Sequence, residues 1–167
     1  MSGEDASPGP GRRRTAARLA AVQALYQIEL TEAPPEGVIR EFGQTGLDRD
    51  GERFGEVDEA LFADLVRGAA AHQDEIDHLL GEALPSDWPV GRLERVLRAI
   101  LRMGAFELLA RDDVPMPVVI SEYLDIGHAF FAGKEPGLVN GVLDRLARTL
   151  RPSEIVGEHR DAGIPPR

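Results

Sequence analysis

Residues 93–130 read LERVLRAILRMGAFELLARDDVPMPVVISEYLDIGHAF and carry two helical patterns. In the first half, apolar residues recur at spacings of three and four up to Leu109, which is typical of a helix with a wide apolar face. In the second half one helix face is shared by Val119, Tyr123, Ile126 and Phe130. The prolines of VPMP (114–117) disfavour helix between the two patterns. We therefore predict two helices joined by a tight turn.

The same spacing extends outward in both directions. An alanine-rich helix is expected to start near Arg12 and to stop at Pro34-Pro35, and a short helix to cover residues 36–42. The stripe over 57–80 fits either one kinked helix or two, and a last helix runs from Val139 to Leu150. Glycine or proline marks 43–55 and 85–89 as loops. Because sustained alternation of period two is absent, the predicted fold class is all-α.

Composition limits the kind of protein. The 167 residues suit one ordinary domain, and the absence of cysteine excludes disulfides, thiolate metal sites and a thiol nucleophile. No apolar run is long enough to span a membrane, and residues 1–11 lack the apolar centre of a signal peptide. We expect a cytoplasmic protein with a disordered tail over 1–11, one helical domain over 12–151 and a flexible tail over 152–167.

Charge is unevenly distributed along the chain. The net charge is −10, and the window 41–87 alone holds 13 acids and 3 arginines, so the remainder is neutral. Within that remainder, four arginines fall in seven residues without an acid, namely Arg12, Arg13, Arg14 and Arg18. A second basic stretch contains Arg92, Arg95, Arg98 and Arg102. An acidic body with local cationic patches still permits binding to a polyanion at those patches.

Catalytic and cofactor patterns are missing. The four histidines form neither a HExxH motif nor part of a Gly-x-Ser-x-Gly elbow, and the phosphate-binding pattern GxxxxGK followed by Ser or Thr does not occur. The acids and histidines of 72–78 fall on different helix faces, as expected of a solvated acidic surface. We expect no enzymatic activity, no cofactor and no metal site.

The first arginine cluster lies at the end of a helix where cations are unfavourable. The amino terminus of a helix carries partial positive charge, so arginine there does not add stability. The cluster is either a polyanion-binding arm or a solvated basic tail, and Thr15 is its candidate N-cap. For Arg92 to Arg102, spacings of three, three and four describe the polar face of an amphipathic helix, with Arg102 partly buried.

Several ordered pieces of the chain together resemble the NusB family of bacterial transcription antitermination factors. They are RTAARLAAVQALY (14–26), AILR (99–102), FEL (106–108), DVP (113–115), VISE (119–122) and VNGVLD (139–144). The resemblance covers about Arg12 to Leu150, with a variable connector over roughly 33–57. It implies about six to seven helices in two three-helix bundles, and no catalysis.

The resemblance also implies partners. Members of this family bind the single-stranded boxA element of nascent RNA together with NusE, a small-subunit ribosomal protein. They support processive transcription of ribosomal RNA operons within an RNA polymerase antitermination complex. Some are monomers and others are homodimers, so a homodimer stays open for this chain.

The site residues follow from the same resemblance. The arginine-rich start of the family's first helix falls on Arg14 and Arg18, beside Arg12 and Arg13. Other expected RNA contacts are Gln23, Tyr26, Lys134, Asn140 and Asp144. Arginine supplies phosphate contacts, whereas Gln, Asn and Tyr reach unpaired bases. Structural roles remain open as alternatives: Tyr26 as a core residue, Asn140 and Asp144 as backbone braces, and Lys134 as a solvent-exposed loop residue.

Two departures from the family pattern affect the RNA surface. Many relatives have Lys-Phe before the VNG motif, whereas this chain has Gly137-Leu138, and an acid frequent two residues before AILR is replaced by Leu97. Two other functions stay possible at this point. One is an RNA-guiding domain like those fused to ribosomal RNA cytosine methyltransferases, although we expect no methyltransferase domain here. The other is a helical adaptor that binds protein but not RNA.

Overall fold

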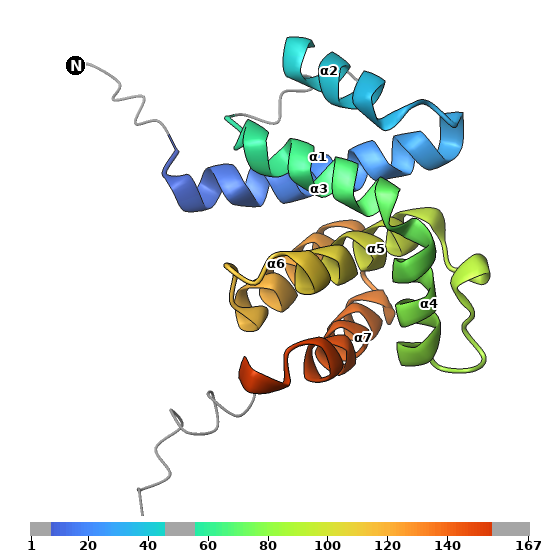
Figure 1. Cartoon of the computed structure of the whole chain (residues 1–167). Coiled ribbons are helices and arrows are strands. Elements are labelled where there is room, and N and C mark those ends of the chain that lie inside the picture. Colours follow the sequence, from blue (N-terminus) through green and yellow to red (C-terminus); the bar gives the residue numbers. More distant parts are fainter. Residues whose placement is uncertain (1–7, 46–55, 155–167) are drawn as a thin grey trace, which may run out of the picture. The chain divides into compact units, whose positions relative to one another are not determined.

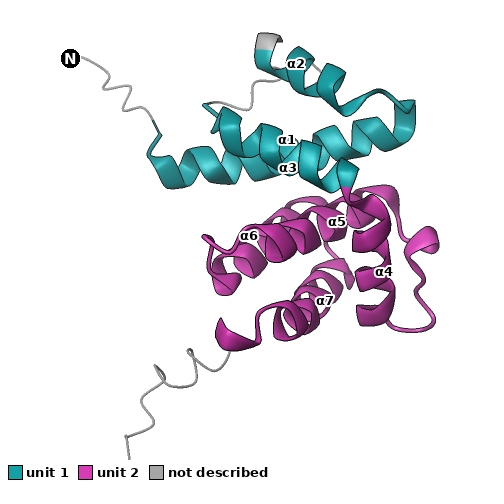
Figure 2. Ribbon diagram, viewed as in Figure 1, with its two compact units in different colours: residues 1–71 teal, residues 72–167 magenta. Residues whose placement is uncertain are grey.

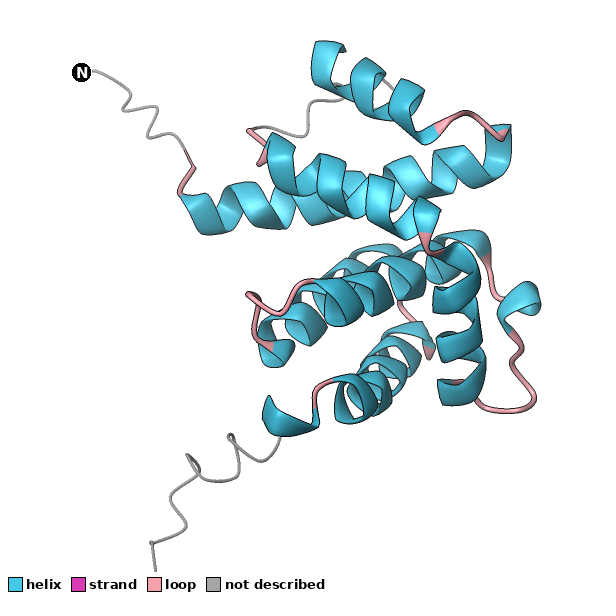
Figure 3. Ribbon diagram, viewed as in Figure 1, coloured by secondary structure: helices cyan, strands magenta, loops and turns pink. Residues whose placement is uncertain are grey.

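The structure is a computed structural model that describes residues 8–45 and 56–154, and for residues 44 and 45 it describes the backbone alone. These residues form seven α-helices and one short 3-10 helix, without a strand (Figures 1 and 3). The chain divides into two compact units, α1 to α3 and α4 to α7 (Figure 2). The predicted all-α class and its two bundles are confirmed, with four α-helices in the second bundle instead of three.

The first unit is built on a pairing of α1 (Pro10–Thr31) with α3 (Glu59–Ala71). Small residues of α1 are fully buried, which lets α3 approach, and Leu65 and Val66 of α3 are likewise inaccessible. Glu32 ends α1 in the left-handed region at φ 56°, just before the predicted stop at Pro34-Pro35. The start is earlier than predicted, because α1 begins at Pro10, so Thr15 lies inside the helix instead of capping it.

Helix α2 (Pro35–Thr45) completes the first unit by packing mainly on α3. Phe42 stacks on Phe62, with ring centroids 4.4 Å apart. Arg67 of α3 donates to both carboxylate oxygens of Glu36, with Nη2 3.1 Å from Oε2. This bidentate contact holds the pKa of Glu36 below its usual value and raises that of Arg67. The loop predicted over 43–55 begins later than expected, since α2 reaches Thr45, and its remaining part lies outside the described residues.

The second unit is arranged around α5 (Arg95–Ala110), which contacts α4 (Gln73–Ala83), α6 (Met116–Phe130) and α7 (Glu135–Leu150). The stretch Leu97–Leu108 is buried throughout, in agreement with the wide apolar face of the sequence. Gly104 allows the close packing, because a Cβ there would lie 2.9 Å from Leu143 Cδ1. Tyr123 donates to Glu107 Oε1 at 2.8 Å, and both side chains are buried.

The stripe over 57–80 is resolved into two helices, which separate at His72. His72 has φ −110° and ψ 22°, outside the helical region, and its ring tilts against Phe106 at a centroid distance of 5.8 Å. The proline-rich connector after α4 is confirmed as a loop and leads into the 3-10 helix η1 (Val90–Arg92).

Two of the four arginines from the second basic stretch do not form a solvated face. Arg98 is 9% exposed, and its Nη1 donates to the carbonyl oxygens of Val90 and Leu93, each at 3.3 Å. Arg102 is buried as well, and two 2.8 Å hydrogen bonds join it to both carboxylate oxygens of Asp77 in α4. Only Arg92 and Arg95 are exposed. The interpretation as one polar helix face is therefore wrong for Arg98, whereas the burial expected for Arg102 is confirmed.

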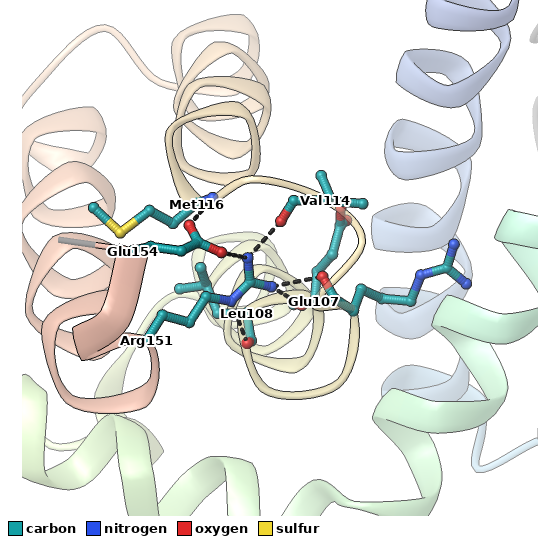
Figure 4. A network of polar contacts seen from close by, with 7 residues as sticks. Glu107, Leu108, Val114, Met116, Arg151 and Glu154 are labelled. Carbon is teal, nitrogen blue, oxygen red and sulfur yellow. Dashed lines mark hydrogen bonds and ion pairs between the residues drawn. The ribbon is translucent and has the colours of Figure 1, made fainter. Parts of the chain in front are cut away.

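The end of α7 fixes the connection between α5 and α6 (Figure 4). Arg151 is 4% exposed and donates to the carbonyl oxygens of Leu108 at 3.0 Å, Glu107 at 3.1 Å and Arg111 at 2.7 Å, and also to that of Val114. Glu154 accepts from Arg151 Nη1 at 2.9 Å and from the Met116 amide at 2.8 Å. The contacts of Glu154 thus join the last described residue of the chain to the start of α6.

Candidate nucleic-acid interface

The first two turns of α1 carry three exposed arginines. Arg12, Arg13 and Arg14 are all solvent-exposed, and the first turn holds no acidic residue. Their positions in a helix point them in three directions, 100° apart. The amide groups at this end of α1 add partial positive charge. This end of the first unit can therefore receive an anion from several sides.

Arg18 does not belong to this exposed set. It is only 2% exposed and ranks among the largest fully buried side chains of the described structure. A guanidinium at that depth cannot donate to a phosphate unless it first leaves its surroundings, which is costly for a buried charge. The expectation that Arg18 contacts RNA directly is not compatible with this buried placement.

Gln23 and Tyr26 lie on the partly exposed face of α1. Positions 12, 23 and 26 differ by eleven and three residues, so the helix places them within about 40° of one direction. Gln23 and Tyr26 are both half-buried, which leaves part of each side chain accessible. Arg12 shares this face and lies about 16 Å away along the helix axis from Gln23. The structure therefore places a cation, an amide and an aromatic ring in one line.

The remaining expected residues belong to α7 in the second unit. Lys134 is the exposed residue just before the helix, and its side chain makes no capping hydrogen bond. Asn140 is exposed, and Asp144 is half-buried on the same side of α7 one turn later. A Cβ at Gly137 or Gly141 would have nothing within 4 Å, so this helix face is open. These residues form a second set, separate from the set on α1.

Arg148 was missed by the sequence analysis, although it lies on that same face of α7. Its Nε donates to Asp144 Oδ2 at 3.0 Å. The i, i+4 spacing of an acid and a basic residue on a predicted helix was the available signal. This spacing is weak evidence for a binding site, because charged pairs near the end of a helix are usually solvated.

Two classes of site have no support in the described part of the chain. Among residues 8–45 and 56–154, no three His, Asp or Glu side chains gather in a way that would hold a metal ion. None of the helices in these ranges is both long enough and apolar enough to cross a bilayer.

These observations define a class of protein: an all-α chain in two helical units, with a cationic first helix. The sequence model of the NusB family matches residues 15–148. The transcription antitermination protein NusB of Granulibacter bethesdensis is 51% identical over 158 residues, covering 89% of this chain and 96% of the relative. NusB of Caulobacter vibrioides is 50% identical, covering 90% and 99%. The chain belongs to the NusB family.

Solved structures agree with that assignment. NusB of T. maritima superposes with a TM-score of 0.71 at 29% identity, covering 89% of this chain and 98% of that chain. A chain from the crystal structure of antitermination factors NusB and NusE in complex with dsRNA gives a TM-score of 0.66 at 25% identity, covering 83% and 98%. The resemblance seen in the ordered sequence pieces is thus confirmed.

Proposed function

We propose that this chain is a transcription antitermination factor that binds boxA-type single-stranded RNA together with NusE. It acts without catalysis, in the cytoplasm, and supports processive transcription of ribosomal RNA operons by RNA polymerase. The observation that carries the proposal is the exposed arginine cluster Arg12, Arg13 and Arg14 in a chain that belongs to the NusB family. A basic tail that served solubility alone would not need to be part of a helix.

The RNA contacts divide by chemistry. Arg12, Arg13 and Arg14 bind phosphates, because guanidinium groups form strong charge-assisted bonds with phosphate oxygens. Gln23 and Tyr26 serve the bases, which in single-stranded RNA are free to stack and to hydrogen-bond. Lys134, Asn140 and Asp144 contribute a second contact set from α7.

The acidic part of the chain is proposed to serve the protein partner. The window 41–87 carries the entire net charge of −10, and its described portion includes the exposed acids Glu59, Asp74 and Glu75. A basic ribosomal protein is attracted to exposed acids, and this attraction accelerates encounter more than it strengthens the final complex. In this proposal, the RNA binds to exposed arginines and NusE binds to exposed acids of the same chain.

The test compares two variants with the same change of charge. Arg12→Gln with Arg14→Gln removes two of the proposed phosphate contacts, whereas Arg92→Gln with Arg95→Gln removes two exposed arginines of the second unit. In titrations of boxA RNA, we expect the first variant to lose about tenfold in affinity or more, and the second to stay near wild type. NusE binding, measured without RNA, should be unchanged in both. Equal RNA affinities of the two variants would contradict the proposal.

A further inference from the structure

Three arginines follow one another at the end of α7, and the structure uses them differently. Arg145 donates to the carbonyl oxygen of Ala83 at 2.7 Å and so ties α7 to the end of α4. Arg151 is occupied by the carbonyl groups that follow α5. Arg148 reaches neither. Its one hydrogen bond within the described residues joins its Nε to Asp144 Oδ2 at 3.0 Å.

That arrangement leaves the terminal Nη groups of Arg148 without a hydrogen bond to the described residues. The side chain of Arg148 is 64% exposed, and that of Asp144 is 43% exposed. Since Asp144 accepts from Nε, the two terminal Nη groups keep their N–H donors for an external acceptor. A guanidinium held along one edge has fewer orientations to lose when it binds, so less entropy opposes binding.

The position of the pair on α7 indicates what that acceptor is. Asn140, Asp144 and Arg148 follow one another at spacings of four, so they lie along one side of the helix. Beside them, the space above Gly137 and Gly141 is open. This side therefore offers an amide for a base and, about 12 Å further along the axis, a cationic fork that matches phosphate geometry.

We propose that Arg148 binds an RNA phosphate and that Asp144 is its positioning residue. The inference rests on the proposed function and refines it, because it changes the role of Asp144. A carboxylate that contacted the RNA directly would repel the phosphates. In the proposed arrangement, the Asp144 carboxylate instead orients the Arg148 guanidinium toward the phosphates and does not contact the RNA itself.

A purely structural role for the pair makes a different prediction. A basic residue in the last turn of a helix and an acid four residues before it both stabilise the helix slightly. In that case Arg148→Gln would lower the unfolding temperature a little and leave RNA binding unchanged. The decisive readout is therefore the salt dependence of RNA affinity, to which helix stability does not contribute.

The first experiment titrates the full-length chain with boxA RNA at several salt concentrations. Arg148→Gln is expected to weaken binding about three- to tenfold and to reduce the slope of log affinity against log salt by about 0.7, the value for one phosphate contact in a single strand. Arg148→Lys should recover part of the loss, since it restores the charge without the fork. Arg95→Gln, an exposed arginine at the start of α5, serves as the matched control and should match wild type.

The second experiment tests Asp144 through a double-mutant cycle. If Asp144 holds the guanidinium, Arg148→Gln costs less affinity in an Asp144→Asn background than in the wild-type background. Equal losses in both backgrounds would show that Asp144 does not position Arg148. Should Arg148→Gln and Arg95→Gln both bind like wild type, the role of Arg148 is refuted while the proposed function stands. A wild-type chain that does not bind boxA RNA would refute the proposed function itself.

Discussion

Arg151 shows how much a single side chain can determine in this fold. A helix leaves its last four carbonyl groups without partners inside the helix, and at the end of α5 those of Glu107 and Leu108 accept from Arg151. The same guanidinium also binds Arg111 and Val114, and it pairs with Glu154. Its removal takes one donor from each of these four carbonyl groups and from the Glu154 carboxylate, which keeps the Met116 amide.

We expect Arg151→Met to destabilise the protein by about 3 kcal/mol. The carbonyl groups around Arg151 each lose a charged N–H donor, while methionine keeps the apolar stem of the side chain. In urea, a loss of this size shifts the unfolding midpoint by about 1–2 M. Arg92→Met is the matched control, since Arg92 is exposed and a surface substitution changes stability by about 0.5 kcal/mol or less. A loss below about 1 kcal/mol for Arg151→Met would mean that water replaces the guanidinium.

The sequence identified which residues are cationic but not which of them are buried. Arg14 and Arg18 both lie in the predicted first helix, yet Arg14 is exposed and Arg18 is buried, with 2% of its surface accessible. Arg98 and Arg102 likewise fit a solvated face by spacing alone. Arg102 is buried against Asp77 of another helix, and Arg98 against the carbonyl groups of Val90 and Leu93. The helical spacing of the arginines contains no information about either set of acceptors. Burial of arginine is therefore the part of the site that sequence reasoning predicted poorly.

Helix boundaries depend on local contacts of the same kind. The start of α5 is capped by Glu94, whose Oε2 accepts from the amides of Val96 at 3.0 Å and Leu97 at 3.2 Å. Glutamate is not among the preferred N-cap residues, so the sequence pattern did not reveal this cap. We expect Glu94→Ala to cost about 1 kcal/mol of stability in urea unfolding, and Glu94→Asp to retain most of it. If both variants lose equally, the carboxylate is not acting as the cap.

The docking of α2 on α3 is expected to depend on pH. Arg67 lowers the pKa of Glu36 through its hydrogen bond, so the folded protein binds that proton less readily than the unfolded chain does. The resulting stabilisation is present above the unfolded pKa, near 4.5, and is lost as the pH falls through the lower folded value. Glu36→Gln should therefore lower the unfolding temperature slightly at pH 7 and by less at pH 3.

Glu56→Gln provides the control for this comparison, because Glu56 is exposed and lies just before α3. It should show the same small difference from wild type at both pH values. A Glu36→Gln effect that persists unchanged at pH 3 would contradict the ion pair. The Phe42–Phe62 stack, which does not titrate, would then be the main contact that holds α2 in place.

Elements with strong apolar periodicity were predicted well, because their packing repeats the pattern of the sequence. The two helices around residues 93–130 are observed as α5 and α6, and the turn between them lies where its prolines predict it. The sequence pattern placed the start of α1 too late, and it left open whether the stripe over 57–80 forms one helix or two. The first depends on Pro10 at the beginning of a helix, and the second on a single residue outside the helical region.

RNA binding depends on where the charges lie in the chain and not on their sum. A net charge of −10 taken alone predicts repulsion of RNA. At physiological salt the screening length is about 8 Å. A group of arginines within that distance attracts a phosphate, whereas the repulsion from acids further away is screened. The sign of the interaction is therefore set by the exposed cations at the contact, not by the total.

The final prediction follows from counting those cations. Arg12, Arg13, Arg14 and Arg148 are the four arginines proposed to bind phosphate, and Lys134 is a fifth cation among the proposed RNA contacts. Single-stranded RNA contributes about 0.7 per contact to the salt slope, so we expect log affinity for boxA RNA to fall against log salt with a slope of about −3 to −4. A slope near zero would show that the arginines do not bind phosphate. A slope steeper than about −5 would require cations beyond those on α1 and α7, with Arg92 and Arg95 the first to test.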